Sequence, residues 1–173
     1  GATGVVSTPS TTYVDVMDAD YLEGMERILV AGQHGTVGLV ELTDNAALLT
    51  LVKDTPNVDF TSLHAISSRE ALLGSSTGML YKFDGENVSE IAQLSEYEEP
   101  ILDIESDGKS IWVVGGRGLI YRSTDMTNYE EVIIDEVTLP LTEFPGNFPA
   151  DWYLGVSNLD TETLMFTASV GGK

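Results

Sequence analysis

The chain has 173 residues, of which 28 are Asp or Glu and 8 are Lys or Arg, so its net charge is −20. Such a surface repels phosphate groups, which argues against nucleic acid as a partner and against binding to anionic membranes. A hydrophobic content of 42% indicates a globular chain, no apolar run approaches the roughly 20 residues that cross a bilayer, and the lack of cysteine excludes disulfides, thiolate metal sites and a cysteine nucleophile.

Four segments share one plan: an apolar strand, a short polar turn, a second strand that ends in small residues and glycine, and usually further strands. The first copy, residues 11–54, predicts strands at 13–17, 27–30, 37–42 and 47–52. The second copy, residues 55–98, predicts strands at 62–66, 71–73, 79–83 and 88–94. A helical turn near residue 46 is a weaker alternative, because every other copy has an outer strand there.

The third copy, residues 99–136, is the clearest, with strands expected at 101–105, 111–114, 119–123 and 131–134. Alternation places Leu102 with Ile104 on one face and Asp103 with Glu105 on the other, which we expect to be exposed. Asp107-Gly108 is typical of a tight hairpin turn. The fourth copy, residues 151–173, predicts only two strands, at 152–156 and 163–167.

Glycines at equivalent positions set the period of the repeat. Gly35, Gly78 and Gly118 are 43 and 40 residues apart, within the range of about 40–50 residues for a four-stranded propeller blade. Glycine suits a tight reversal between strands because it adopts positive φ and lets backbones approach closely. The sequence therefore predicts an all-β, β-propeller-like fold of about three and a half antiparallel blades, in one repeat domain over residues 1–173. We expect Trp112, Val114, Leu72, Ile28 and Phe166 in its cores.

The third copy resembles the repeats of photosystem II stability/assembly factors and the related BNR or sialidase-like propellers. The resemblance rests on residues 116–125, Gly-Arg-Gly-Leu-Ile-Tyr-Arg-Ser-Thr-Asp, which are similar to the strand that leads into an Asp-box turn. The turn of that family continues with two glycines and ends in Trp. This chain has Met-Thr-Asn-Tyr instead, with Tyr129 near the Trp position. The resemblance implies the propeller fold more than any activity.

A closed propeller needs at least about four blades, and this chain supplies three and a half. The chain could be cut from a longer protein, another subunit could supply the missing strands, or residues 4–6 could add a strand to the last sheet. The first is the preferred interpretation, and the second and third make the sheet edge at residues 163–170 a site for strand addition.

No residue pattern predicts an enzyme. The acids Asp103, Glu105 and Asp107 resemble the start of a calcium loop, but an EF-hand would need an acid at Val114. Asp15, Asp18 and Asp20 form a second acidic loop, and calcium binding is not the preferred interpretation there either. His34 could face the channel, although a histidine bonded to backbone is the simpler reading. Sialidase-like chemistry needs clustered arginines, and the four in this chain belong to different copies: Arg27, Arg69, Arg117 and Arg122.

The segment at 137–150 interrupts the repeat and contains three prolines, so it predicts an inserted loop. Long loops on a rigid β scaffold often bind partners, although a loop that covers a sheet edge is equally compatible. We predict four partner-binding residues: Phe144, Phe148, Trp152 and Arg117. No metal or cofactor is expected.

The sequence thus predicts a non-enzymatic protein-binding or assembly scaffold, with a protein partner or self-association through a sheet edge. A glycan-binding or glycan-processing propeller and a structural subunit of a larger particle are the alternatives. Composition does not fix the compartment, although an extracytoplasmic location is slightly favoured.

Overall fold

The computed structural model describes residues 15–44, 46–133, 152–158 and 164–169, and within the last two ranges it describes side chains at 155–157 only. The chain folds into successive antiparallel sheets, which confirms the predicted all-β class. Within the described residues, helical structure is limited to a 3-10 turn, Gln33–Gly35, and no helix is long and apolar enough to cross a membrane.

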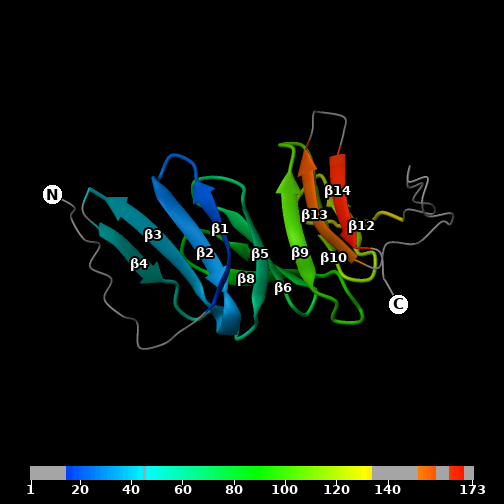
Figure 1. The fold of residues 1–173 in the computed structure, drawn as a ribbon, viewed down its shortest axis with the longest axis horizontal. Helices are drawn as coiled ribbons and strands as arrows, with labels where there is room; N and C mark the ends of the chain where they lie inside the picture. The colour runs from blue at the N-terminus through cyan, green and yellow to red at the C-terminus, as the bar shows by residue number, and fades with distance from the viewer. Residues whose placement is uncertain (1–14, 45, 134–151, 159–163, 170–173) are drawn as a thin grey trace.

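Three sheets have four strands each and follow one another in chain order (Figure 1). Sheet A contains β1 (Val16–Leu22), β2 (Arg27–Gly32), β3 (Val37–Thr43) and β4 (Ala46–Leu51). Sheet B contains β5 (Phe60–Ala65), β6 (Ala71–Ser75), β7 (Met79–Phe83) and β8 (Val88–Gln93). Sheet C contains β9 (Ile101–Ser106), β10 (Ile111–Gly115), β11 (Ile120–Ser123) and β12 (Glu130–Glu131). Sheet D has two strands, β13 (Trp152–Asn158) and β14 (Leu164–Ser169).

A bulge at the same place in every first strand shows that the four sheets are copies of one unit. The pairing between first and second strands shifts register at Met17, Thr61, Leu102 and Leu154. A bulge bends the strand and increases its twist. This common bulge aligns the sheets residue by residue, so that Val16, Phe60 and Ile101 occupy equivalent positions.

The sheets stack face to face through apolar side chains. Sheets A and B share a core that includes Leu29, Phe60 and Phe83, all fully buried. Sheets B and C share a second core around Leu80 and Ile104. Apolar burial of this kind is the main stabilising contribution, since removing a buried Phe costs about 3–5 kcal/mol.

The residues that were expected in the cores differ in how deeply they are buried. Val114 and Leu72 are buried, at 0% and 1% exposure, as predicted. Trp112 is half-buried and packs against the core formed by Val114, Ile120 and Val156, whereas Ile28 is half-buried, which corrects the prediction for Ile28. The Arg122 guanidinium lies over the Trp112 ring, and Ile28 faces away from sheet B. The side chain of Phe166 is outside the described residues.

Residues 46–51 form a strand, as predicted in preference to a helical turn, and the last strand of the third copy is shorter than predicted. Residues 4–6 and the inserted loop at 137–150 lie outside the described residues. The assignment of residues 1–173 to one domain stays a prediction.

Candidate functional site

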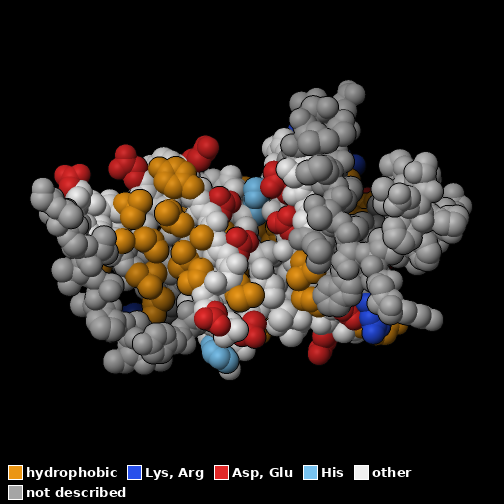
Figure 2. Space-filling model, in the orientation of Figure 1, with side chains coloured by type: hydrophobic (Ala, Val, Ile, Leu, Met, Phe, Trp, Pro, Cys, Tyr) orange, Lys and Arg blue, Asp and Glu red, His pale blue; other side chains and the backbone are white. Residues whose placement is uncertain are grey.

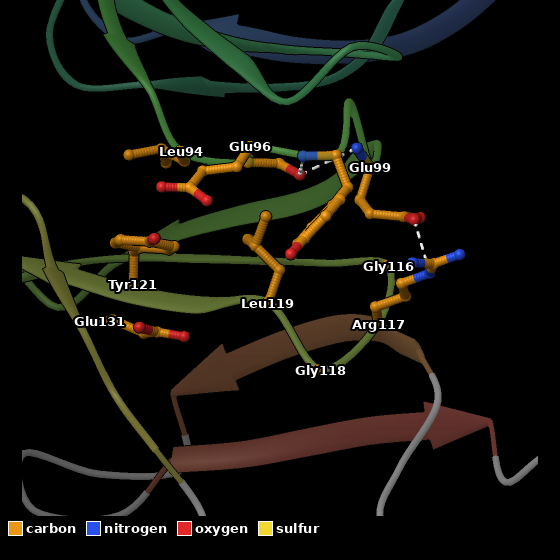
Figure 3. A pocket seen from close by; sticks show the side chains of 11 residues that line it. Leu94, Glu96, Glu99, Gly116, Arg117, Gly118, Leu119, Tyr121 and Glu131 are labelled. Atoms are coloured by element: carbon orange, nitrogen blue, oxygen red, sulfur yellow. Dashed lines mark hydrogen bonds and ion pairs between the residues drawn. The ribbon is translucent and has the colours of Figure 1, made fainter.

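A surface pocket of about 440 Å³ lies at the junction of sheets B and C. Its wall combines the loop between β8 and β9 with the turn between β10 and β11, and it includes predicted residue Arg117. Figure 3 shows Arg117 and Glu99 at one end, Tyr121 with Glu96 and Glu131 at the other, and Leu119 between them. The pocket therefore has an apolar middle and charged ends.

The side chain of Ser95 stabilises the loop between β8 and β9. This buried side chain accepts hydrogen bonds from the backbone N–H groups of Tyr97 and Glu99, at 3.2 and 2.9 Å. The Gln93 amide holds the same loop by donating to the carbonyl oxygens of Ser95 and Thr77. Serine hydroxyls commonly stabilise turns in this way. The loop thus presents Glu96, Tyr97 and Glu99 in a fixed order at the pocket.

Glycine is required where the loop crosses the preceding turn. Gly78 has a φ of +73°, and a Cβ built there would lie 2.5 Å from Ser95 Cβ and 2.7 Å from the carbonyl oxygen of Glu99. On the opposite wall, Arg117 and Gly118 both have positive φ, 51° and 76°. Two successive positive φ values are typical of a type I′ turn. The predicted structural role of the repeat glycines is confirmed at these positions.

Arg117 projects over the loop. Its Nε lies 2.7 Å from Glu99 Oε1, and its guanidinium lies 5.9 Å from the centre of the Tyr97 ring. The Arg117 side chain is 69% exposed whereas that of Glu99 is 15% exposed, so the guanidinium still reaches solvent. Arg117 can therefore pair with the Glu99 carboxylate and also donate hydrogen bonds from its remaining N–H groups to a bound molecule.

The other end of the pocket is acidic. Burial raises the pKa of the Tyr121 hydroxyl, and the carboxylates of Glu131 and Glu96 raise it further. Glu96 and Glu131 are exposed, and neither forms an ion pair with a residue that the structure describes. This end is suited to a cationic group beside an aromatic ring.

The acids considered for calcium have other roles. Asp103 is half-buried between two sheets, which corrects the expectation that it is exposed, and its carboxylate accepts from the N–H groups of Ile104 and Val156. Asp107 accepts from Lys109 and Ser110 and so closes the predicted hairpin turn. The hydrogen bond from the Ser110 N–H is the largest cause of the lowered pKa of Asp107, and the bond from the Lys109 N–H lowers this pKa further. Among the described residues, no group of three acids or histidines is arranged to hold a metal ion.

Asp18 corresponds to Asp103 in the first copy. It lies in β1 rather than in an acidic loop, and its Oδ2 accepts from the N–H of Leu63 at 2.7 Å. The equivalent residue of sheet B is Ser62, and there the neighbouring Thr61 donates instead to the carbonyl oxygen of Ile101. Short polar side chains thus join the first strands of successive sheets at all three junctions.

The two histidines lie on separate elements. His34 occupies the turn before β3, where its exposed side chain extends from a backbone whose N–H donates to Asp59. The Nδ1 of His64 lies 3.9 Å from Asp20 Oδ2 and 3.8 Å from Glu105 Oε2, three residues that are equivalent in successive sheets. This row of one His between two acids was not predicted, because it requires the register of three first strands.

The arginines do not form one cluster with shared partners. Arg27 pairs with Glu41, Arg117 with Glu99, and Arg122 donates to Ser110. Phe144 and Phe148 lie outside the described residues, and Trp152 is described only as the backbone that begins β13. Of the four predicted binding residues, the structure therefore places the side chain of Arg117 alone.

The Asp-box-like turn closes on itself. Asp125 accepts hydrogen bonds from the backbone N–H groups of Thr127 and Asn128, and from the Asn128 side chain. These bonds hold the pKa of Asp125 well below its usual range. Tyr129, near the position of the family's Trp, packs against the core between sheets B and C. The hydrogen bonds that Asp125 accepts thus stay within the turn, and Tyr129 joins the turn to the core.

Comparison with known proteins agrees with this architecture. No protein-family model and no curated protein matches the chain. Among solved structures, one described as "YCF48 bound to D1 peptide" is similar, with a TM-score of 0.56 and 19% sequence identity over 70% of this chain. The protein in that structure is a photosystem II assembly factor with a propeller of BNR repeats.

This chain has the fold of successive propeller blades. The match covers 41% of the other chain, so this chain spans less than half of the propeller that it resembles. At 19% identity the likeness concerns the fold, and the predicted resemblance to BNR-repeat propellers is confirmed at that level.

Proposed function

We propose that the chain is a non-enzymatic protein-binding module, and that the pocket between sheets B and C holds a segment of its partner. The observation that carries this proposal is the pocket itself, with Leu119 between the Arg117–Glu99 pair and the acidic end at Glu96 and Glu131. Pockets with an apolar lining and a few oriented polar groups are typical of ligand sites.

The partner segment carries a basic side chain next to an apolar one. A Lys or Arg fits between Glu96 and Glu131 over the Tyr121 ring, and an apolar side chain fits against Leu119. A net charge of −20 also attracts basic partners over longer distances. The protein in the similar structure is bound to a peptide, which is compatible with peptide binding at a blade junction of this chain.

A glycan-processing function has less support. Such chemistry needs arginines that converge on one carboxylate, and here Arg27, Arg117 and Arg122 are engaged with different partners. Phe144, Phe148 and Trp152 remain predicted binding residues of the inserted segment.

Selection from a displayed library of random peptides tests the proposal. Selected peptides should be rich in Lys or Arg beside apolar residues. A Glu96→Gln, Glu131→Gln double variant should bind them at least tenfold more weakly in fluorescence anisotropy. Glu90→Gln removes an exposed carboxylate from β8 outside the pocket and is the single-charge control, with Glu86→Gln, Glu90→Gln as the matched double.

Two results would contradict the proposal. One is equal loss of affinity in the pocket variant and the matched double control, which would reduce binding to a general effect of charge. The other is recovery of no basic peptide, together with binding of the chain on a carbohydrate array.

A further inference from the structure

One face of sheet A is apolar, and no other strand that the structure describes packs on it. The strand pairing places alternate residues of β1–β4 on the face that points away from sheet B. Five of them are large and about half exposed: Val16 54%, Tyr21 49%, Leu42 60%, Leu49 51% and Leu51 59%. Figure 2 shows hydrophobic side chains gathered over this sheet. We call this surface the outer face of sheet A.

Equivalent faces of the next two sheets are covered. Val16 corresponds to Phe60 in sheet B and to Ile101 in sheet C, and both of these are 0% exposed. Phe60 belongs to the core shared with sheet A, and Ile101 belongs to the core shared with sheet B. Each sheet thus uses this face to receive the sheet before it. Within the described residues, no sheet precedes sheet A.

Charge does not oppose a second protein surface there. The residues that alternation places on the outer face are the apolar or small members of β1–β4, and none is Asp, Glu, Lys or Arg. Arg27 and Glu41 pair on the opposite face of the sheet. Two copies of a chain with a net charge of −20 can therefore meet here without bringing carboxylates of these strands together.

We propose that the outer faces of sheet A from two copies of this chain pack against each other, apolar surface on apolar surface. The same face of sheets B and C already buries apolar side chains against a neighbouring sheet of the chain. Contiguous apolar patches rimmed by polar residues commonly mark protein association, and anionic lipid is disfavoured by the acidic charge. This contact is separate from the pocket between sheets B and C.

Sedimentation velocity over a range of concentrations tests the proposal with the whole chain. The wild type should form a concentration-dependent dimer, and Leu49→Asp should raise its dissociation constant at least tenfold. The matched control is Leu48→Asp, because Leu48 is 60% exposed on the same strand but points to the opposite face. That variant should associate like the wild type.

Circular dichroism establishes that each variant is folded, and Leu42→Glu repeats the test from β3 if Leu49→Asp is not. A wild type that stays monomeric at every concentration would overturn the proposal. So would equal effects of Leu48→Asp and Leu49→Asp, or a monomer that instead floats with vesicles of zwitterionic lipid.

Discussion

The Oδ2 atom of Asp103 lies 2.9 Å from the backbone nitrogen of Val156, and this hydrogen bond joins the first strands of sheets C and D. Asp18 makes the same bond to Leu63 between sheets A and B, at 2.7 Å. The two aspartates are equivalent in the repeat, because each lies just after the bulge of its first strand. A carboxylate at this position therefore helps to fix how successive sheets stack.

Two substitutions of Asp103 should distinguish the contribution of its hydrogen bonds to stability from the contribution of its charge. Asp103→Ala removes the acceptor of both the Ile104 and Val156 N–H groups, so we expect a loss of about 1–3 kcal/mol in the free energy of unfolding. Asp103→Asn keeps an acceptor oxygen and should lose less. Urea unfolding at pH 7 measures both variants, and equal losses would contradict the role of the acceptor.

The pH dependence of stability should also report on Asp103. Burial raises its pKa, and the nearby charge of Asp18 adds to the rise, although the two backbone hydrogen bonds oppose it. A raised pKa means that the folded protein binds the proton more tightly than the unfolded chain, so protonation at this site favours folding. As pH falls from 7 toward about 4, the wild type should gain stability relative to Asp103→Asn. Parallel pH profiles for the two proteins would contradict this expectation.

Tyr129 offers a test of the Asp-box-like turn. Burial raises the pKa of its hydroxyl to about 12, with a smaller contribution from Asp125. The hydroxyl oxygen is buried and has no hydrogen-bond partner among the described residues. Tyr129→Phe should therefore leave the free energy of unfolding unchanged or raise it by up to about 1 kcal/mol, as thermal unfolding would show. A clear loss of stability would indicate a partner for this hydroxyl.

The sequence was sufficient to predict the sheets because their signals are local. Glycines at a period near 40 residues, with turn residues such as Asp107-Gly108, mark where strands reverse. The burial of single residues was harder to predict. Ile28 looks like a core residue, yet its exposure depends on which face of sheet A is covered, and alternation alone does not specify that.

The pocket depends on contacts across two copies of the repeat. Arg117 was predicted as a binding residue, whereas Glu96, Tyr97 and Glu99 were not. A usable signal was present, since Tyr97 lies among three acids, Glu96, Glu98 and Glu99, in the short segment between β8 and Pro100. Its meaning depends on the packing of that loop against the turn at Arg117, which the spacing of the repeat does not reveal.

The two glycines at Gly78 and Gly108 distinguish a packing requirement from a purely conformational one. Both have positive φ, +73° and +79°, so alanine at either position adds a left-handed penalty of about 1 kcal/mol. A Cβ at Gly108 meets nothing within 4 Å, whereas one at Gly78 meets Ser95 and the backbone of Glu99.

Gly78→Ala should therefore lose about 1–3 kcal/mol more than Gly108→Ala in thermal or urea unfolding. Because the clash falls on the loop that forms the pocket, Gly78→Ala should also weaken binding of the selected basic peptides, and Gly108→Ala should not. Equal losses of stability in the two variants would show that the β8–β9 loop can move away from Gly78 at little cost.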